Sequence, residues 1–123
     1  MIIGHGIDLV EHESFSRLVV YDDAFLKRCF TETEIEIGKS NSDSVQWFAS
    51  RFAAKEAVMK ALGTGWSRGI SWHDIRIQPD EHGRPEIQLS GKAREIATGL
   101  GISGMSISLS HAHRASIASV IAT

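Results

Sequence analysis

Residues 51–65 read RFAAKEAVMKALGTG, a stretch that predicts a helix ending in a glycine turn. Its alanines are strong helix formers and allow close packing. Gly63 and Gly65 stand where such a helix ends, because glycine readily takes the left-handed conformation of a C-cap. The same helix places the carboxylate of Glu56 one turn before the ammonium of Lys60. It therefore carries both a packing surface and the first candidate for chemistry.

The predicted helix extends upstream to cover roughly residues 44–62. Apolar residues such as Val45 and Phe52 continue its pattern. Asp43 or Ser44 supplies the N-cap, a position where short polar side chains accept hydrogen bonds from free backbone N–H groups.

Shorter elements flank this helix on both sides. Those before it are a strand over 2–10 with close backbone approach at Gly4 and Gly6, helices over 11–20 and 22–29, and a short helix with a capping box from Thr31 to Glu34. Those after it are a loop over 66–74 with two tryptophans, a hairpin of strands 75–78 and 86–89, a helix over 91–99 capped by Ser90, and a C-terminal hairpin of strands 105–110 and 115–122. We therefore expect a single α+β domain over residues 1–123, with a small antiparallel sheet packed by the long central helix and shorter helices.

The composition is that of an ordinary globular protein of 123 residues, with 42% apolar and 23% charged residues. A net charge of −2 argues against bulk electrostatic binding of nucleic acid. The only cysteine, Cys29, excludes an internal disulfide, suits a reducing compartment and is expected to be a small hydrophobe in a helix. No run approaches the ~20 apolar residues of a membrane span. Residues 1–8 lack a signal-peptide pattern, so we expect a cytoplasmic protein that does not bind membranes.

The Glu56–Lys60 pair has two interpretations. As an ion pair on a solvated helix face it would stabilise the helix by ~0.2–0.5 kcal/mol, and spacing alone favours this explanation. However, the stripe continues to Phe52 and lies close to Met59 and Gly63, so the face is partly apolar. Charges that face an apolar region need a partner or a task. A carboxylate beside an ammonium suits the binding of a metal ion and a phosphate.

Asp8 stands near the end of the first predicted strand, where two roles are equally open. It can cap the following helix, since aspartate is a favoured N-cap residue. It can also be an oxygen ligand for Mg²⁺, which usually takes one or two protein carboxylates and completes its shell with water and phosphate oxygens.

Three further features suit phosphate binding but also have ordinary explanations. Arg51 could clamp a phosphate, although a single helical arginine is usually a surface residue. The Gly63–Gly65 turn could admit a ligand close to the backbone, or it could be only a helix cap. His111 could donate to a phosphate from the end of a serine-rich strand, or it could form a metal pair with His113, two residues away. From spacing alone the sequence predicts a phosphate-handling Mg²⁺ enzyme.

Four segments in order carry a resemblance to a known family. They are GIDLV at 6–10, FTETE at 30–34, RFAAKEA at 51–57 continuing to GTG at 63–65, and SLSH at 108–111, with GRP at 83–85 between the last two. In order and spacing the chain closely resembles the holo-[acyl-carrier-protein] synthases, the short bacterial 4′-phosphopantetheinyl transferases, over nearly its whole length. The central segment is highly specific, and the others are strong in combination.

The resemblance implies an activity and partners. Such enzymes transfer 4′-phosphopantetheine from coenzyme A to a serine of apo acyl carrier protein, in fatty acid biosynthesis, and release adenosine 3′,5′-bisphosphate. They have the 4′-phosphopantetheinyl transferase fold and form homotrimers, with active sites in clefts between neighbouring subunits. The expected cofactor is Mg²⁺, and the expected partners are coenzyme A and acyl carrier protein.

The motif matches also imply residue roles. Asp8 and Glu56 match the family's Mg²⁺ ligands, and Lys60 matches its pyrophosphate-contacting lysine. Arg51 and His111 match positions that meet the coenzyme A phosphates or lie close by. The physical argument agrees, because a bound cation and a lysine would neutralise the charge that grows on the leaving phosphate. Either Glu56 or a metal-bound water could accept the serine proton.

One position departs from the family pattern. Members usually carry an arginine six residues after the aspartate of the opening motif, on the helix that grips the acidic carrier protein, and here that residue is Ser14. We expect docking to rely on Arg17 and Arg28 and to be less electrostatic than in other members. The departure also keeps open a non-catalytic trimer that binds coenzyme A. A structural domain with an incidental ion pair is the third hypothesis.

Overall fold

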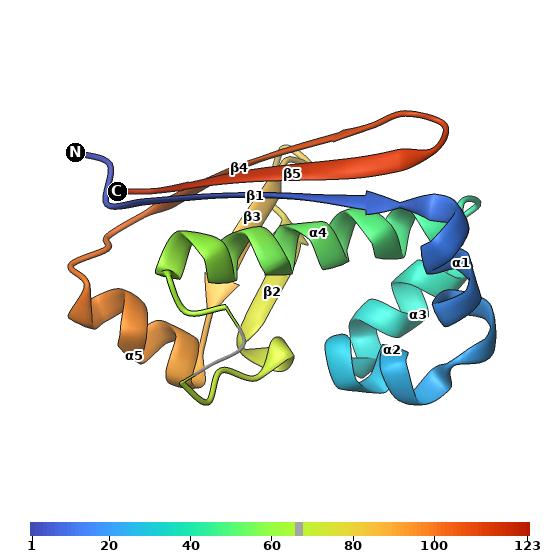
Figure 1. The fold of residues 1–123 in the computed structure, drawn as a ribbon, viewed down its shortest axis with the longest axis horizontal. Helices are drawn as coiled ribbons and strands as arrows, with labels where there is room; N and C mark the ends of the chain where they lie inside the picture. The colour runs from blue at the N-terminus through green and yellow to red at the C-terminus, as the bar shows by residue number, and fades with distance from the viewer. Residues whose placement is uncertain (66–67) are drawn as a thin grey trace.

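A computed structural model describes residues 1–65 and 68–123 of the chain. Its elements are β1 (Gly4–Glu11), α1 (His12–Tyr21), α2 (Asp23–Cys29), α3 (Glu32–Ser40), α4 (Ser44–Leu62), the 3-10 helix η1 (Trp72–Asp74), β2 (Ile75–Pro79), β3 (Pro85–Leu89), α5 (Gly91–Gly99), β4 (Met105–His111) and β5 (Ala115–Ala122). The architecture is α+β, as predicted, with the long helix α4 at its centre (Figure 1). None of the described helices is long and apolar enough to cross a membrane.

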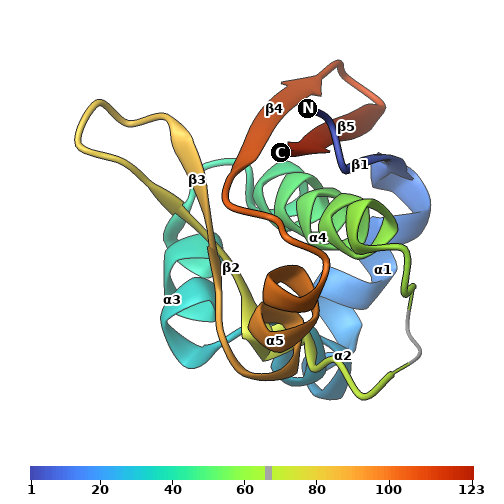
Figure 2. The same cartoon turned by 90° about the vertical axis from the view of Figure 1, so that its left-hand side faces the viewer.

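The expected small antiparallel sheet contains three strands in the order β1–β5–β4. The first strand of the chain therefore pairs with the last, and Asp8 lies opposite Ala118 in this register. β2 and β3 form a separate two-stranded antiparallel sheet. Figure 2 shows that this hairpin projects to one side of α4, while the three-stranded sheet lies above the helix.

β1 packs directly on the backbone of α4. A Cβ atom added at Gly4 would collide with the carbonyl oxygen of Ala61, and one added at Gly6 would collide with that of Ala57. Glycine and alanine therefore face each other where strand and helix meet, and the close approach predicted from the sequence is confirmed.

Other elements cover the opposite side of α4. The sheet lies along one side of the helix, and α1, α2, α3 and β2 lie on the other (Figures 1 and 2). Rings of Phe15, Phe25, Phe52 and Trp72 pack together where α1, α2, α4 and η1 meet. α4 is consequently buried on most of its surface, and its alanines are among the buried residues.

The helix ends agree with most of the predicted caps. Asp43 caps α4 by accepting from the backbone N–H of Gln46, and Gly63 closes the helix at a φ of 74°. The predicted capping box between Thr31 and Glu34 is present at the start of α3.

Three smaller expectations have different outcomes. Ser90 occupies the N-cap position of α5, but its side chain makes no capping hydrogen bond. Cys29 is buried at the end of α2, as expected of a small hydrophobe, and burial raises the pKa of its thiol to about 11. In the loop expected over 66–74, Trp66 lies outside the described residues and Trp72 begins η1.

Candidate functional site

The close packing of β1 on α4 brings Asp8 beside Lys60. Asp8 lies two residues beyond Gly6, on the same face of the strand, because alternate strand residues share a face. Lys60 Nζ lies 3.2 Å from Asp8 Oδ1 and donates to the backbone carbonyl of Ile7 at 2.8 Å. Among the ion pairs of residues 1–65 and 68–123, none joins Lys60 to Glu56, so the simple helix-surface ion pair is wrong.

Glu56 is half-buried beside these two residues. Burial raises the pKa of its carboxyl, the negative charge of Asp8 raises it further, and Lys60 lowers it. The Asp8 side chain is 14% exposed and that of Lys60 is 51% exposed. The two carboxylates are thus close enough to repel each other, while the ammonium reaches solvent.

Both carboxylates line an open cavity of about 450 Å³. Its other lining residues are Leu9, Val10, Glu11, Ser14, Phe15, Leu18 and Phe52. The cavity is therefore bounded by β1, α1 and α4, and its wall combines three acids, Asp8, Glu11 and Glu56, with apolar side chains. Ser14, the position that departs from the family pattern, is part of this wall.

Asp8 does not cap the following helix. It lies inside β1, and Glu11 occupies the N-cap position of α1 without a side-chain capping bond. The alternative that Asp8 is only a helix cap is therefore wrong.

Arg51 lies in a different cavity from Asp8 and Glu56. Its guanidinium stacks over the ring of Trp47 at 4.7 Å, and Nη1 donates to Ser50 Oγ at 2.9 Å. Burial lowers the pKa of Arg51, and the charge of Glu34 opposes that shift. The Arg51 cavity has a volume of about 480 Å³ and is lined by Thr31, Thr33, Glu34, Ile37, Trp47, Arg51, Arg76, Ile77, Gln78 and Pro79. It shares no lining residue with the Asp8–Glu56 cavity.

His111 is the exposed last residue of β4. His113 lies beyond the strand, in the turn to β5, so the two histidines do not share a strand face as the metal-pair alternative required. The part of the chain that the structure describes contains no group of three or more His, Cys, Asp or Glu residues able to hold a metal ion. Two carboxylates with open positions remain compatible with Mg²⁺, which usually keeps several water ligands.

The glycine turn after α4 is open to solvent. Gly63 and Gly65 have φ angles of 74° and 54°, and both are exposed. A Cβ at either position would meet nothing within 4 Å. The predicted helix stop is confirmed, and the turn leaves room for a ligand beside the end of the helix that carries Lys60.

Lys55 has a structural role that the sequence did not indicate. It is fully buried, and its Nζ donates to Glu34 Oε1 at 2.9 Å and to the carbonyl oxygens of Cys29 and Trp72. Burial lowers the pKa of Lys55, and Glu34 opposes that shift. The capping box predicts the role of Glu34 at the start of α3. It does not predict that Glu34 also pairs with Lys55, which lies 21 residues away along the chain.

The arrangement gives each chain two separate groups of polar side chains. Asp8, Glu56 and Lys60 offer two carboxylates for a cation and one ammonium for a phosphate. Arg51, with Arg76 in the same cavity, offers positive charge elsewhere on the molecule. Such groups suit chemistry at a phosphate, because charge stabilisation and positioning supply most of what phosphoryl transfer requires.

Known proteins resemble the chain over its whole length. The 4'-phosphopantetheinyl transferase superfamily matches residues 4–118. The holo-[acyl-carrier-protein] synthase of Koribacter versatilis is 43% identical over 122 residues, which cover 98% of each chain. The structure of holo-[acyl-carrier-protein] synthase from Neisseria meningitidis superposes with a TM-score of 0.90 at 35% identity, covering 100% of this chain and 99% of that one. The structure of Helicobacter pylori holo-[acyl-carrier-protein] synthase in complex with coenzyme A superposes with a TM-score of 0.83 at 32% identity, covering 97% of this chain and 99% of that one.

Proposed function

The chain belongs to the 4'-phosphopantetheinyl transferase superfamily and is a phosphopantetheinyl transferase, and on this premise we propose its full reaction. It transfers 4′-phosphopantetheine from coenzyme A to a serine of apo acyl carrier protein, with Mg²⁺ as cofactor. The observation that carries the proposal is that Asp8 and Glu56 line one cavity and that Lys60 is paired with Asp8. Residues 1–123 act as a single domain.

The donor set at this cavity fits Mg²⁺. The pKa of Glu56 is raised first by burial and then by the negative charge of Asp8, so a divalent cation held by the two carboxylates would relieve an existing repulsion. Mg²⁺ would there neutralise charge on the pyrophosphate oxygens of coenzyme A.

Lys60 and Glu56 suit the transfer of phosphopantetheine to the carrier serine. The serine Oγ forms a bond to the phosphorus that carries pantetheine, and the bond from that phosphorus to the bridging pyrophosphate oxygen breaks. Adenosine 3′,5′-bisphosphate leaves with the electron pair, and Lys60 Nζ stabilises the negative charge that it gains. Glu56 is one acceptor for the serine proton, and its raised pKa suits a general base; a water molecule is the other.

The active enzyme is proposed to be a homotrimer. Ile7 and Leu9 lie on the outer face of the three-stranded sheet, 51% and 57% exposed, and Ile121 shares that face through its register with His5. An exposed apolar sheet face supports association between chains. Because Arg51 lies outside the Asp8–Glu56 cavity, we propose that Arg51 and His111 of one subunit complete the coenzyme A site of its neighbour, with Gly63 and Gly65 close to the phosphates.

Acyl carrier protein is proposed to approach over α1. Ser14 and Leu18 line the cavity that holds Asp8 and Glu56, so α1 borders the opening through which a carrier serine would reach them. Arg17 and Arg28 are exposed nearby, whereas Glu13 on the same helix carries the opposite charge. Weak salt dependence of the Michaelis constant for carrier protein supports docking of this kind. A steep dependence that survives Arg17→Ala and Arg28→Ala contradicts it.

We place the reaction in fatty acid biosynthesis in the cytoplasm. Relatives named for the acyl carrier protein support the pathway, and the single buried cysteine suits a reducing compartment.

The test of the proposed function is direct. The protein is incubated with coenzyme A, Mg²⁺ and apo acyl carrier proteins, and each carrier is weighed by mass spectrometry. A gain equal to 4′-phosphopantetheine, lost when Mg²⁺ is chelated and in Glu56→Ala, supports the proposal. Binding of coenzyme A without any mass gain would instead favour the non-catalytic trimer.

A further inference from the structure

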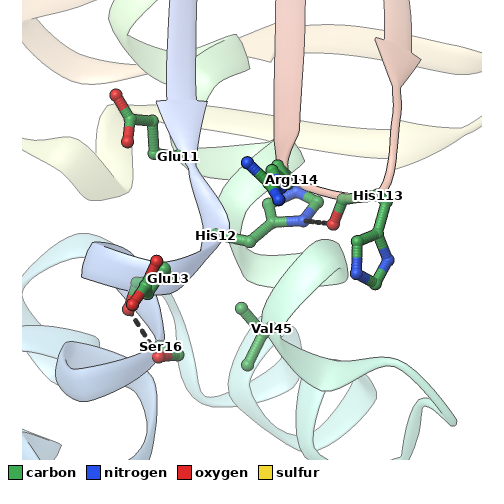
Figure 3. Close-up of a pocket in the computed structure, with 7 residues that line it drawn as sticks. All are labelled: Glu11, His12, Glu13, Ser16, Val45, His113 and Arg114. Atoms are coloured by element: carbon green, nitrogen blue, oxygen red, sulfur yellow. Dashed lines mark hydrogen bonds between the residues drawn. The ribbon is translucent and has the colours of Figure 1, made fainter.

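His12 attaches the turn between β4 and β5 to the junction of β1 and α1. Its backbone N–H donates to the carbonyl oxygen of Arg114 at 2.8 Å. Its ring Nδ1 lies 3.1 Å from the carbonyl oxygen of His113, and its Nε2 lies 2.8 Å from Ser116 Oγ. Figure 3 shows the ring of His12 directed at the turn. One residue thus makes three hydrogen bonds to the four-residue segment 113–116.

The partners of the ring fix its tautomer. The carbonyl oxygen of His113 can only accept, so Nδ1 of His12 carries the hydrogen. In the neutral ring Nε2 is then an acceptor, and it receives the hydroxyl hydrogen of Ser116, a fully buried side chain. Both ring nitrogens are therefore occupied by the hairpin, and the imidazole cannot rotate without breaking both bonds.

His111 is the next residue affected by this attachment. In the β4–β5 register, His111 lies directly opposite Ser116, and cross-strand partners point to the same face of a sheet. The turn that His12 holds begins immediately after His111, and its own closing bond runs from the Ala112 N–H to the carbonyl oxygen of Ala115 at 2.9 Å. Among the described residues β4 is an edge strand that pairs by hydrogen bonds with β5 alone, so the end that carries His111 depends on that pairing and on the turn.

We propose that His12 is a positioning residue for coenzyme A binding, acting through His111. His12 holds the end of the β4–β5 hairpin so that the exposed imidazole of His111 keeps one place, ready to donate to a coenzyme A phosphate. Preorganisation of this kind raises affinity because less freedom is lost on binding. The inference rests on the proposed function, which assigns the phosphate contact to His111.

The chain offers a matched control. His73 Nε2 lies 2.9 Å from the carbonyl oxygen of Lys27, so His73 is also a histidine that ties one element to the backbone of another. It lines neither the Asp8–Glu56 cavity nor the Arg51 cavity. His73→Ala therefore removes a similar bond without touching the hairpin that carries His111.

The experiment measures kcat and KM for coenzyme A together with the melting temperature. His12→Ala is expected to raise KM about threefold to tenfold, the effect of losing a hydrogen bond that orders a binding residue, with kcat little changed. His12→Asn, which keeps a donor near the position of Nδ1, is expected to recover most of the loss. His73→Ala is expected to leave KM unchanged, whatever its effect on melting.

A double variant separates positioning from general stability. If His12 acts through His111, adding His12→Ala to His111→Ala raises KM no further. Additive effects, or a His12→Ala variant whose KM equals that of the wild type, would overturn the inference. Calorimetric titration with coenzyme A repeats the comparison without turnover. Failure of carrier modification in the wild type would therefore count against the proposed function alone, whereas equal coenzyme A affinity in wild type and His12→Ala would count against the role of His12.

Discussion

Lys60 Nζ lies 3.2 Å from Asp8 Oδ1, so the ammonium of α4 pairs with a carboxylate from β1 and not with Glu56 on its own helix. Asp8 has two tasks in the proposed site, since it would bind the cation and it orients Lys60. We predict that Asp8→Asn lowers kcat/KM by about 10²–10³, the range found when one charge-stabilising group is removed from an active site. Steady-state kinetics with apo acyl carrier protein measures the loss.

The matched control for this prediction is Glu95→Gln. Glu95 is an exposed acid on α5 that lines neither cavity, and its substitution should leave kcat/KM unchanged. A folded Asp8→Asn protein with wild-type kcat/KM would remove Asp8 from the site.

The pKa of Glu56 predicts how the metal-free protein responds to pH. This pKa is raised above its ordinary value of 4.5, mainly by burial and then by Asp8. A carboxyl with a raised folded-state pKa contributes stability at low pH, and that contribution is lost as pH rises through the folded pKa. Glu56→Gln should therefore raise the melting temperature near pH 7 in the absence of Mg²⁺, and the gain should vanish near pH 4. Thermal scans of both proteins between pH 4 and pH 7 in a chelating buffer measure this difference in melting temperature.

Ionisation of Glu56 should lower the stability of the metal-free protein but raise the catalytic activity of the protein with Mg²⁺ bound. The ionised carboxylate is the form that would bind Mg²⁺ and accept a proton, so kcat/KM should fall as pH drops through the raised pKa of Glu56. An acid limb that is unchanged in Asp8→Asn, where the repelling charge is gone, would disagree with this assignment.

Much of the fold follows from local signals in the sequence. The alanine-rich pattern predicts α4, Gly63 predicts its end, and Gly4 and Gly6 predict a strand that touches another backbone. These features depend on residues within a few positions of one another, which is the range where helix and turn propensities act. Part of the candidate site could be predicted for the same reason, because Glu56 and Lys60 are one helical turn apart.

The remaining features depend on contacts between distant segments. Asp8 and Lys60 are 52 residues apart, and Lys55 pairs with Glu34 across 21 residues. Periodicity predicts which face of an element is buried but not which element covers it. A buried lysine is also uncommon, so the pattern gave no reason to separate Lys55 from its exposed neighbours.

Gly6 tests whether close packing of β1 on α4 controls the site. A Cβ at Gly6 would collide with the carbonyl oxygen of Ala57, and backbone atoms cannot move aside as a side chain can. Gly6→Ala should destabilise the protein by about 3 kcal/mol and displace Asp8 from Lys60. Gly99→Ala is the control, because a Cβ there meets nothing within 4 Å and its φ is not positive. Urea denaturation should show a change within about 1 kcal/mol for the control.

Because Lys55 and Glu34 form a buried ion pair, we predict that replacing Lys55 destabilises the protein strongly and that a second substitution at Glu34 restores part of the stability. Lys55→Met leaves the carboxylate of Glu34 buried without its charged partner, which costs about 3–5 kcal/mol in comparable cases. Glu34 Oε2 already lacks a hydrogen-bond partner among the described residues, and without Lys55 the carboxylate keeps the capping-box bond from the Thr31 N–H and the nearby charge of Arg51. Adding Glu34→Gln removes that charge and should recover part of the loss. Denaturation at one protein concentration compares the three proteins, and a double variant less stable than Lys55→Met would contradict the explanation.

Mixing inactive subunits tests whether two chains build one site. The cavity with Asp8 and Glu56 shares no lining residue with the cavity of Arg51. If Arg51 serves the neighbouring subunit's cleft, trimers assembled from Glu56→Ala and Arg51→Ala chains contain some clefts with both native residues. Random assembly places them together in about one quarter of the clefts, so activity should return to roughly that fraction of wild type.

The control for mixing uses two residues from the same cavity. Glu56→Ala mixed with Asp8→Asn should give no recovery, because Asp8 and Glu56 of one chain face each other and every cleft keeps one defect. Activity is measured after the two chains are unfolded and refolded together, with each variant refolded alone as the baseline. Recovery in the first mixture but not in the second requires that the catalytic cleft lies between subunits. Equal outcomes in both mixtures would return Arg51 to a purely structural role, packed on Trp47 within its own chain.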